Sequence, residues 1–106
     1  MQFHKLSDFH RGWIIGDFTP SIFRTSDFEV CVTHHQKDEP TVSHYHARSK
    51  EYNIVLEGEI WVSGKALKKG DIFVYEENEN SNVRFSSDTS LLVVRVPSLP
   101  DDKFLA

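Results

Sequence analysis

Two histidines and one glutamate stand close together in the middle of the chain, in an order that suits metal binding. His44 and His46 are two positions apart, so both side chains point to the same face of an extended strand. Glu51 begins the next β-prone run after a short polar connection and can meet the two imidazoles. Two histidines and one carboxylate are the ligand set of open-sided sites for Fe(II) and related ions, which leave positions free for substrate or oxygen. We therefore predict that His44, His46 and Glu51 bind one divalent transition metal, with Fe, Mn, Ni and Zn not distinguishable.

The spacing of these residues resembles a known motif. The pattern His-x-His-x4-Glu-x6-Gly over residues 44–58 resembles the first motif of the cupin superfamily, and Lys69–Val74 resembles the start of its second motif. Ser81 stands where the second motif has its histidine, with Asn82 beside it. The resemblance to a small single-domain cupin implies an all-β fold, a cupin-type jelly-roll barrel of antiparallel strands with little helix. It also implies that the three ligands face the interior.

Short β-prone runs separated by turn formers predict the scaffold that must position these ligands. Antiparallel sheets are expected because no amphipathic helix of convincing length is present. Residues 51–57 and 59–63 are expected to form a hairpin at Gly58, and 83–85 and 91–96 a further hairpin. Other strands are expected at 12–15, 21–24, 28–35, 66–67 and 71–75.

Three further polar residues are expected to line the pocket. Asn53 shares the face of Glu51 in the strand, where it suits a substrate contact or a partner for the carboxylate. Tyr75 ends a strand just before a polar loop and can reach the cavity with its hydroxyl. Asn82 offers a carbonyl oxygen to a hard ion.

The alternation in residues 28–35 predicts a half-buried strand whose more apolar face includes Val30, Val32 and His34. His34 is accordingly expected in the core or at the barrel mouth, and His35 is expected to be exposed or at a subunit contact.

Length and composition bound the organisation of the protein. A chain of 106 residues, 39% hydrophobic and 26% charged, is expected to fold as one domain over residues 1–106. Residues 1–26 are rich in aromatic side chains and are expected to form N-terminal strands and an interface segment, which predicts a homodimer. The two prolines in residues 97–106 predict an irregular tail.

Charge and hydropathy argue against two classes of partner. The net charge is −4 and no basic cluster is longer than Lys68-Lys69, so neither nucleic acid nor an anionic membrane surface is expected to bind. No apolar run approaches the roughly 20 residues that span a bilayer. The lone Cys31 and an N-terminal sequence unlike a secretory signal predict the cytoplasm.

Three functions remain open at this point, all with a small-molecule partner. The protein could be an enzyme, a metal-dependent oxidoreductase of the dioxygenase type or an isomerase, acting on an oxygen-bearing metabolite or sugar. It could instead bind such a ligand without turnover. The third alternative is a metal-free sugar isomerase or epimerase with His44 or His46 as general base, Glu51 orienting that base, and Tyr75 as acid.

Overall fold

Strands are the main secondary structure of the computed structural model, which describes residues 1–105. Within these residues the helical elements are the single 3-10 turns η1 (Leu6–Asp8) and η2 (His10–Gly12). The predicted all-β fold with little helix is therefore confirmed. The strands are β1 (Trp13–Gly16), β2 (Phe23–Arg24), β3 (Glu29–His35), β4 (His44–Tyr45), β5 (Lys50–Glu57), β6 (Glu59–Val62), β7 (Lys65–Lys68), β8 (Ile72–Tyr75), β9 (Val83–Phe85), β10 (Thr89–Val96) and β11 (Phe104–Leu105).

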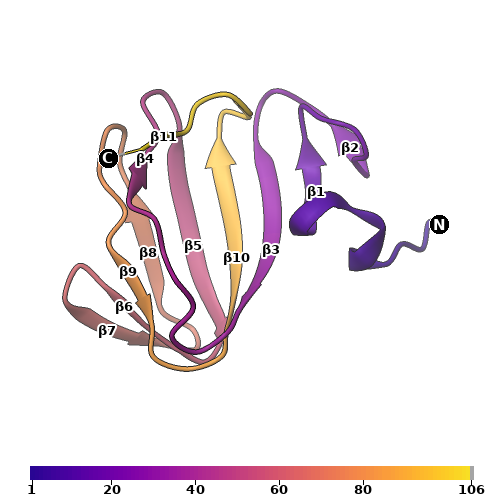
Figure 1. Cartoon of the computed structure of the whole chain (residues 1–106). Coiled ribbons are helices and arrows are strands. Elements are labelled where there is room, and N and C mark those ends of the chain that lie inside the picture. The colour runs from indigo at the N-terminus through magenta and orange to yellow at the C-terminus, as the bar shows by residue number, and fades with distance from the viewer. Residues whose placement is uncertain (106) are drawn as a thin grey trace.

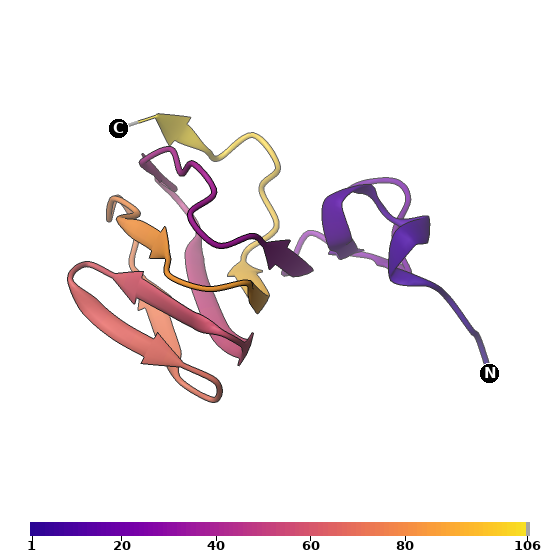
Figure 2. The same ribbon diagram turned by 60° about the horizontal axis from the view of Figure 1, so that its bottom comes forward.

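The strands form three sheets. A six-stranded sheet has the order β2-β1-β3-β10-β5-β8, a three-stranded sheet the order β7-β6-β9, and a two-stranded sheet joins β11 to β4. The pairings are antiparallel except that of β1 with β2. In Figure 1, β5, β10 and β3 run side by side and the N-terminal turns lie beyond β1. Figure 2 shows the N-terminal segment, in indigo, projecting away from the other strands.

Both predicted hairpins are wrong, because strands that follow each other in the chain enter different sheets. β5 pairs with β10 and β8, whereas β6 pairs with β7 and β9. β9 and β10 are likewise in separate sheets. Gly58 therefore marks a crossover between sheets and not a hairpin turn.

The backbone at this crossover leaves no room for a side chain at position 58, so glycine is required there. The φ of Gly58 is 89°, and a Cβ atom built there would lie 2.1 Å from the Asp88 carbonyl oxygen. We expect Gly58→Ala to lower the free energy of unfolding, measured in urea, by at least the 1–3 kcal/mol roughly typical of a strained backbone position. Gly64→Ala is the matched control, because Gly64 has a φ of 80° but nothing within 4 Å of the added Cβ. Equal losses in the two variants would show that the contact with Asp88 has no part in the effect.

The inner face of the sheets has an apolar end and a polar end. The six most buried apolar side chains form one cluster that joins the six-stranded sheet to the three-stranded sheet: Cys31, Val55, Ile60, Phe85, Leu91 and Val93. At the other end, Arg95 is in register with Glu29 of β3 and with Glu51 of β5, and Glu51 is in register with Tyr75 of β8. This row places charged side chains inside the fold.

The predicted inward face of β5 is confirmed, and that of β3 is wrong. Glu51, Asn53 and Val55 are 7%, 4% and 1% exposed, as the alternation requires. In β3 it is the face of Glu29 and Cys31 that is buried, so His34 is exposed and His35 half-buried. The more hydrophobic face of β3 was predicted to be the buried one, and this prediction failed because the inner face of β3 is itself partly polar.

The two ends of the chain differ in how well they were predicted. Residues 97–106 are not irregular throughout, because β11 pairs with β4; Ala106 lies outside the described residues. Residues 1–26 do contain two strands, and Phe3 and Phe23 remain 87% and 56% exposed. These exposed groups are compatible with a homodimer, which stays a prediction. In the described part of the chain, no helix has the length and apolar character needed to cross a membrane.

Candidate functional site

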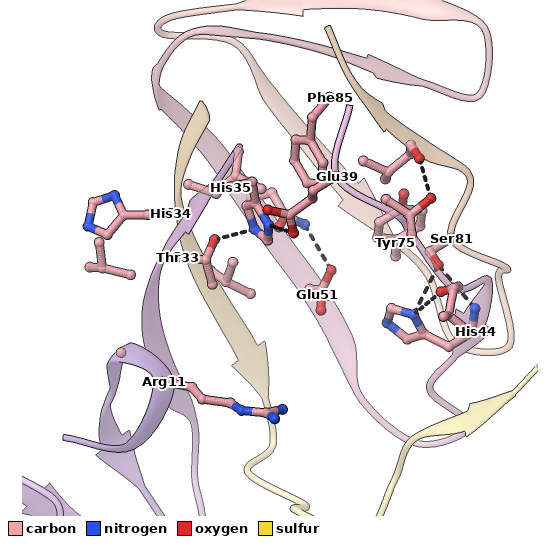
Figure 3. A pocket seen from close by; sticks show the side chains of 18 of the residues that line it. Arg11, Thr33, His34, His35, Glu39, His44, Glu51, Tyr75, Ser81 and Phe85 are labelled. Carbon is pink, nitrogen blue, oxygen red and sulfur yellow. Dashed lines mark hydrogen bonds and ion pairs between the residues drawn. The ribbon is translucent and has the colours of Figure 1, made fainter. Parts of the chain in front are cut away.

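An open cavity of about 1400 Å³ lies against the inner face of the six-stranded sheet. Five of the six residues predicted from the sequence line it: His44, Glu51, Asn53, Tyr75 and Asn82. The sixth, His46, is 6% exposed and lies beside Glu51. In Figure 3 the labelled side chains of Glu51, Tyr75 and His44 lie on the same side of the strands, whereas His34 points away on the left. The structure thus brings the predicted residues to one region.

His46 is held in a defined tautomer. Its Nδ1 lies 2.5 Å from the backbone carbonyl oxygen of Asp102, which can only accept a hydrogen bond, so Nδ1 carries the proton. Nε2 is then an unprotonated, buried atom without a hydrogen-bond partner among the described residues. Burial, and after it the charge of Arg95, lowers the pKa of His46, which keeps the ring neutral at physiological pH. His46 therefore presents a lone pair at Nε2, 3.7 Å from Oε1 of Glu51.

His44 is fixed by the loop that follows β8. Its Nδ1 is 3.1 Å from the Val42 carbonyl oxygen and 3.1 Å from Oγ of Ser81, and its backbone carbonyl accepts a 2.7 Å hydrogen bond from the Ser81 amide. The ring packs edge-on against His46, with the centroids 5.3 Å apart. Ser81, which the resemblance to the second motif places at the position of its histidine, thus positions His44.

Glu51 forms an ion pair with a residue that the sequence analysis did not single out. Arg95 Nε donates to Oε1 of Glu51 at 2.8 Å, and Asn53 Nδ2 donates to Oε2 at 3.2 Å. Burial alone would raise the pKa of Glu51, but the guanidinium and the amide hold it below its usual value. The predicted role of Asn53 as a partner of the carboxylate agrees with this geometry.

Tyr75 provides a second unpartnered group. It is 8% exposed and in register with Glu51, and its O–H donates to no acceptor among the described residues, although the Asn82 backbone amide faces the phenol oxygen. Burial raises the pKa of Tyr75 to about 12, so the phenol stays protonated and is available as a donor. Asn82, by contrast, is exposed at the edge of the cavity.

The predicted metal ligands fit an ion only in part. Both imidazoles have Nδ1 bonded to protein oxygen atoms, which is how ligating histidines are usually oriented. Glu51 fits poorly, because an ion at its Oε1 would have to displace the Arg95 guanidinium or lie beside that positive charge. Among residues 1–105, no three His, Cys, Asp or Glu side chains are grouped so that they could hold a metal. Metal binding by His44, His46 and Glu51 stays a prediction.

Three residues of the site were missed from the sequence. Arg95 interrupts an apolar run, and the alternation of Leu91, Val93 and Arg95 could have placed it on the inner face. His35 lines the cavity, stacks on Phe85 with ring centroids 4.1 Å apart, and contacts Glu39 at 2.9 Å. Asp102 lies in the tail, where no local pattern indicated it.

Comparison with known proteins gives structural matches only: no family model and no curated protein matches the chain. An uncharacterised conserved protein with a double-stranded β-helix domain from Klebsiella pneumoniae is 25% identical, with a TM-score of 0.70 over 77% of this chain and 72% of that one. A protein from Shewanella frigidimarina that contains a cupin-2 domain is 18% identical, with a TM-score of 0.56 over 68% and 72%. Pirin YhhW from Escherichia coli, solved with nickel(II), is 18% identical, with a TM-score of 0.68 over 82% and 39%.

Proposed function

Because the chain belongs by its fold to the cupin superfamily, we propose that its cavity binds a small oxygen-bearing metabolite or sugar through His46 and Tyr75. The observation that carries this proposal is a pair of buried polar atoms without partners among the described residues, Nε2 of His46 and the hydroxyl of Tyr75. Nε2 of His46 lies 3.7 Å from Oε1 of Glu51, and Tyr75 is in register with Glu51. A buried polar group left without a hydrogen bond costs roughly 1–3 kcal/mol. A bound molecule that satisfies both groups recovers this cost.

The two groups specify what the bound molecule must offer. Neutral His46 accepts a hydrogen bond at Nε2, and protonated Tyr75 donates one. A hydroxyl next to a carbonyl or a second hydroxyl provides the complementary donor and acceptor. The same two groups are a proton acceptor and a proton donor, which are the general base and general acid that isomerisation or epimerisation needs. Binding without turnover needs the two groups only as hydrogen-bond partners.

The backbone of Asp102, and not Glu51, orients the candidate base. The carbonyl of Asp102 fixes the tautomer of His46, whereas Glu51 lies on the Nε2 side of the ring. Glu51 and Arg95 pair with each other beside His46, and Glu51 is in register with Tyr75.

A thermal-shift panel of aldoses, ketoses and hydroxy acids tests the proposal. A compound present at ten times its Kd is expected to stabilise the protein by about 1.4 kcal/mol, which raises the Tm by several degrees. Tyr75→Phe should abolish most of this rise. Tyr52→Phe is the matched control, because Tyr52 neighbours Glu51 in the chain but is 41% exposed on the outer face. Equal Tm shifts in both variants, or no compound that shifts the Tm, would contradict the proposal.

A divalent ion held by His44, His46 and Glu51 is the second candidate, and the free lone pair of His46 favours it. Chelator-treated protein is titrated with Mn, Fe, Ni or Zn while the Tm is followed. The first proposal expects no specific rise. A rise with one ion bound per chain that is lost in His46→Ala would support the ion instead and would require Glu51 to exchange Arg95 for the metal.

A further inference from the structure

We propose that the molecule bound in the cavity carries a carboxylate or phosphate group and that Arg95 and Arg11 bind this group. The inference rests on the proposed function and narrows the ligand to a hydroxy acid, a sugar acid or a sugar phosphate. Two observations support the inference: the charged side chains that line the cavity, and the fact that its carboxylates are already paired within the protein while its arginines have unused N–H groups.

Arg95 is only partly used by the protein. Its Nε is bonded to Glu51, while no hydrogen bond within the described residues involves its two terminal nitrogens. The guanidinium carbon lies 4.7 Å from the centroid of the Trp13 ring, so the plane of the group is held between an aromatic face and a carboxylate. A guanidinium fixed in this way presents its remaining N–H groups as a preorganised fork, which matches the paired oxygen atoms of a carboxylate or phosphate.

Arg11 is the second cation of the cavity. It lies in η2 with a φ of 52°, and its carbonyl oxygen accepts a hydrogen bond from Sγ of buried Cys31, which fixes the backbone at the wall of the cavity. Figure 3 shows its side chain extended toward the space below Glu51, with no interaction drawn to it. No carboxylate in the described part of the chain forms an ion pair with Arg11.

The charges of the cavity do not balance. Arg11, Arg95 and Lys103 line it together with the carboxylates of Glu39 and Glu51. Each carboxylate is already bonded inside the protein, Glu39 to His35 and to the Gln36 amide, and Glu51 to Arg95 and Asn53. The charged side chains that line the cavity therefore carry a positive excess, in a chain whose net charge is −4. Glu29, on the other side of Arg95, is buried and does not line the cavity. A concave site with this local excess attracts anions even though the molecule as a whole repels them.

The position of Arg95 places the anionic group next to the groups that bind the rest of the ligand. Arg95 and Tyr75 are the two register neighbours of Glu51 on opposite sides of β5. A carboxylate or phosphate bound to Arg95 of β10 is thus separated from Tyr75 of β8 only by β5, the strand that carries Glu51. A compact molecule with an acidic group close to a hydroxyl or carbonyl spans this distance.

The test uses the full chain with 15N-labelled arginine. Its Nε–H signals are followed by NMR during titration with inorganic phosphate or with acetate, at constant ionic strength maintained with potassium chloride. We expect saturable shifts at Arg95 and Arg11. Arg24, paired with Asp17 on the surface, and Arg84, stacked on Trp61, are internal controls that should not shift. The anion that binds with the lower Kd shows whether the ligand's acidic group is a phosphate or a carboxylate.

Variants complete the test. Arg11→Gln, at an exposed position that leaves the Glu51 ion pair intact, should weaken the apparent Kd for the anion at least tenfold, and Arg95→Lys should do the same. Arg24→Gln should leave it unchanged. Equal shifts at all arginines, or unchanged affinity in Arg11→Gln, would overturn the inference. If neutral sugars raise the Tm but neither anion perturbs Arg95, only this inference fails; if nothing binds, the proposed function fails as well.

Discussion

Replacing Arg95 with methionine is expected to lower the free energy of unfolding by about 3–5 kcal/mol, because the change leaves buried carboxylates without their cation. Glu51 and Glu29 flank Arg95 on the inner face and are 7% and 3% exposed. Oε1 of Glu29 already has no hydrogen-bond partner among the described residues. Urea unfolding at neutral pH measures the loss.

Two controls separate the buried ion pair from the loss of a long side chain. The double variant Arg95→Met/Glu51→Gln removes both charges and should recover a large part of the stability. Arg24→Met breaks the exposed pair with Asp17, whose side chains are 65% and 45% exposed, and should cost less than about 1 kcal/mol. If the double variant is no more stable than Arg95→Met, the ion pair does not explain the effect.

Asp102→Asn is expected to lower the free energy of unfolding by about 1.5–3 kcal/mol, the range of a hydrogen bond to a charged group. The Asp102 carboxylate is 0% exposed and accepts hydrogen bonds from the amides of Ala47, Arg48 and Ser49 at 3.2, 2.8 and 2.9 Å. An asparagine amide has only one acceptor oxygen, so it leaves part of this set unsatisfied. Since the carbonyl of the same residue orients His46, ligand binding should weaken together with stability.

The pH dependence provides an independent check on Asp102. Burial alone would raise its pKa, but the three amide donors hold the pKa of Asp102 below its usual value. A depressed carboxyl pKa stabilises the folded state above the unfolded-state pKa of about 3.9, and this contribution is lost as the pH falls through the folded-state pKa. The wild-type free energy of unfolding should therefore fall more steeply in acid than that of Asp102→Asn. Parallel curves would show that the carboxylate makes no such contribution.

The sequence alone determined which side chains lie inside the fold where the pattern was strongest. Alternation in an extended strand is a local property, so Glu51, Asn53 and Val55 were correctly assigned to one inward face. The spacing of His44, His46 and Glu51 also selected three residues that the structure brings close together. The same reasoning chose the wrong face of β3, because burial beside a polar cavity does not follow hydrophobicity.

Only the tertiary structure decided what those side chains contact. Glu51 meets Arg95 from 44 residues away, and His46 meets the Asp102 carbonyl from 56 residues away. Such partners depend on which strands become neighbours and on where the tail docks, and the crossover at Gly58 sends consecutive strands to different sheets. These long-range contacts give the predicted ligands their surroundings: the neutral ring of His46, the ion pair of Glu51 with Arg95, and the terminal nitrogens of Arg95 at the cavity.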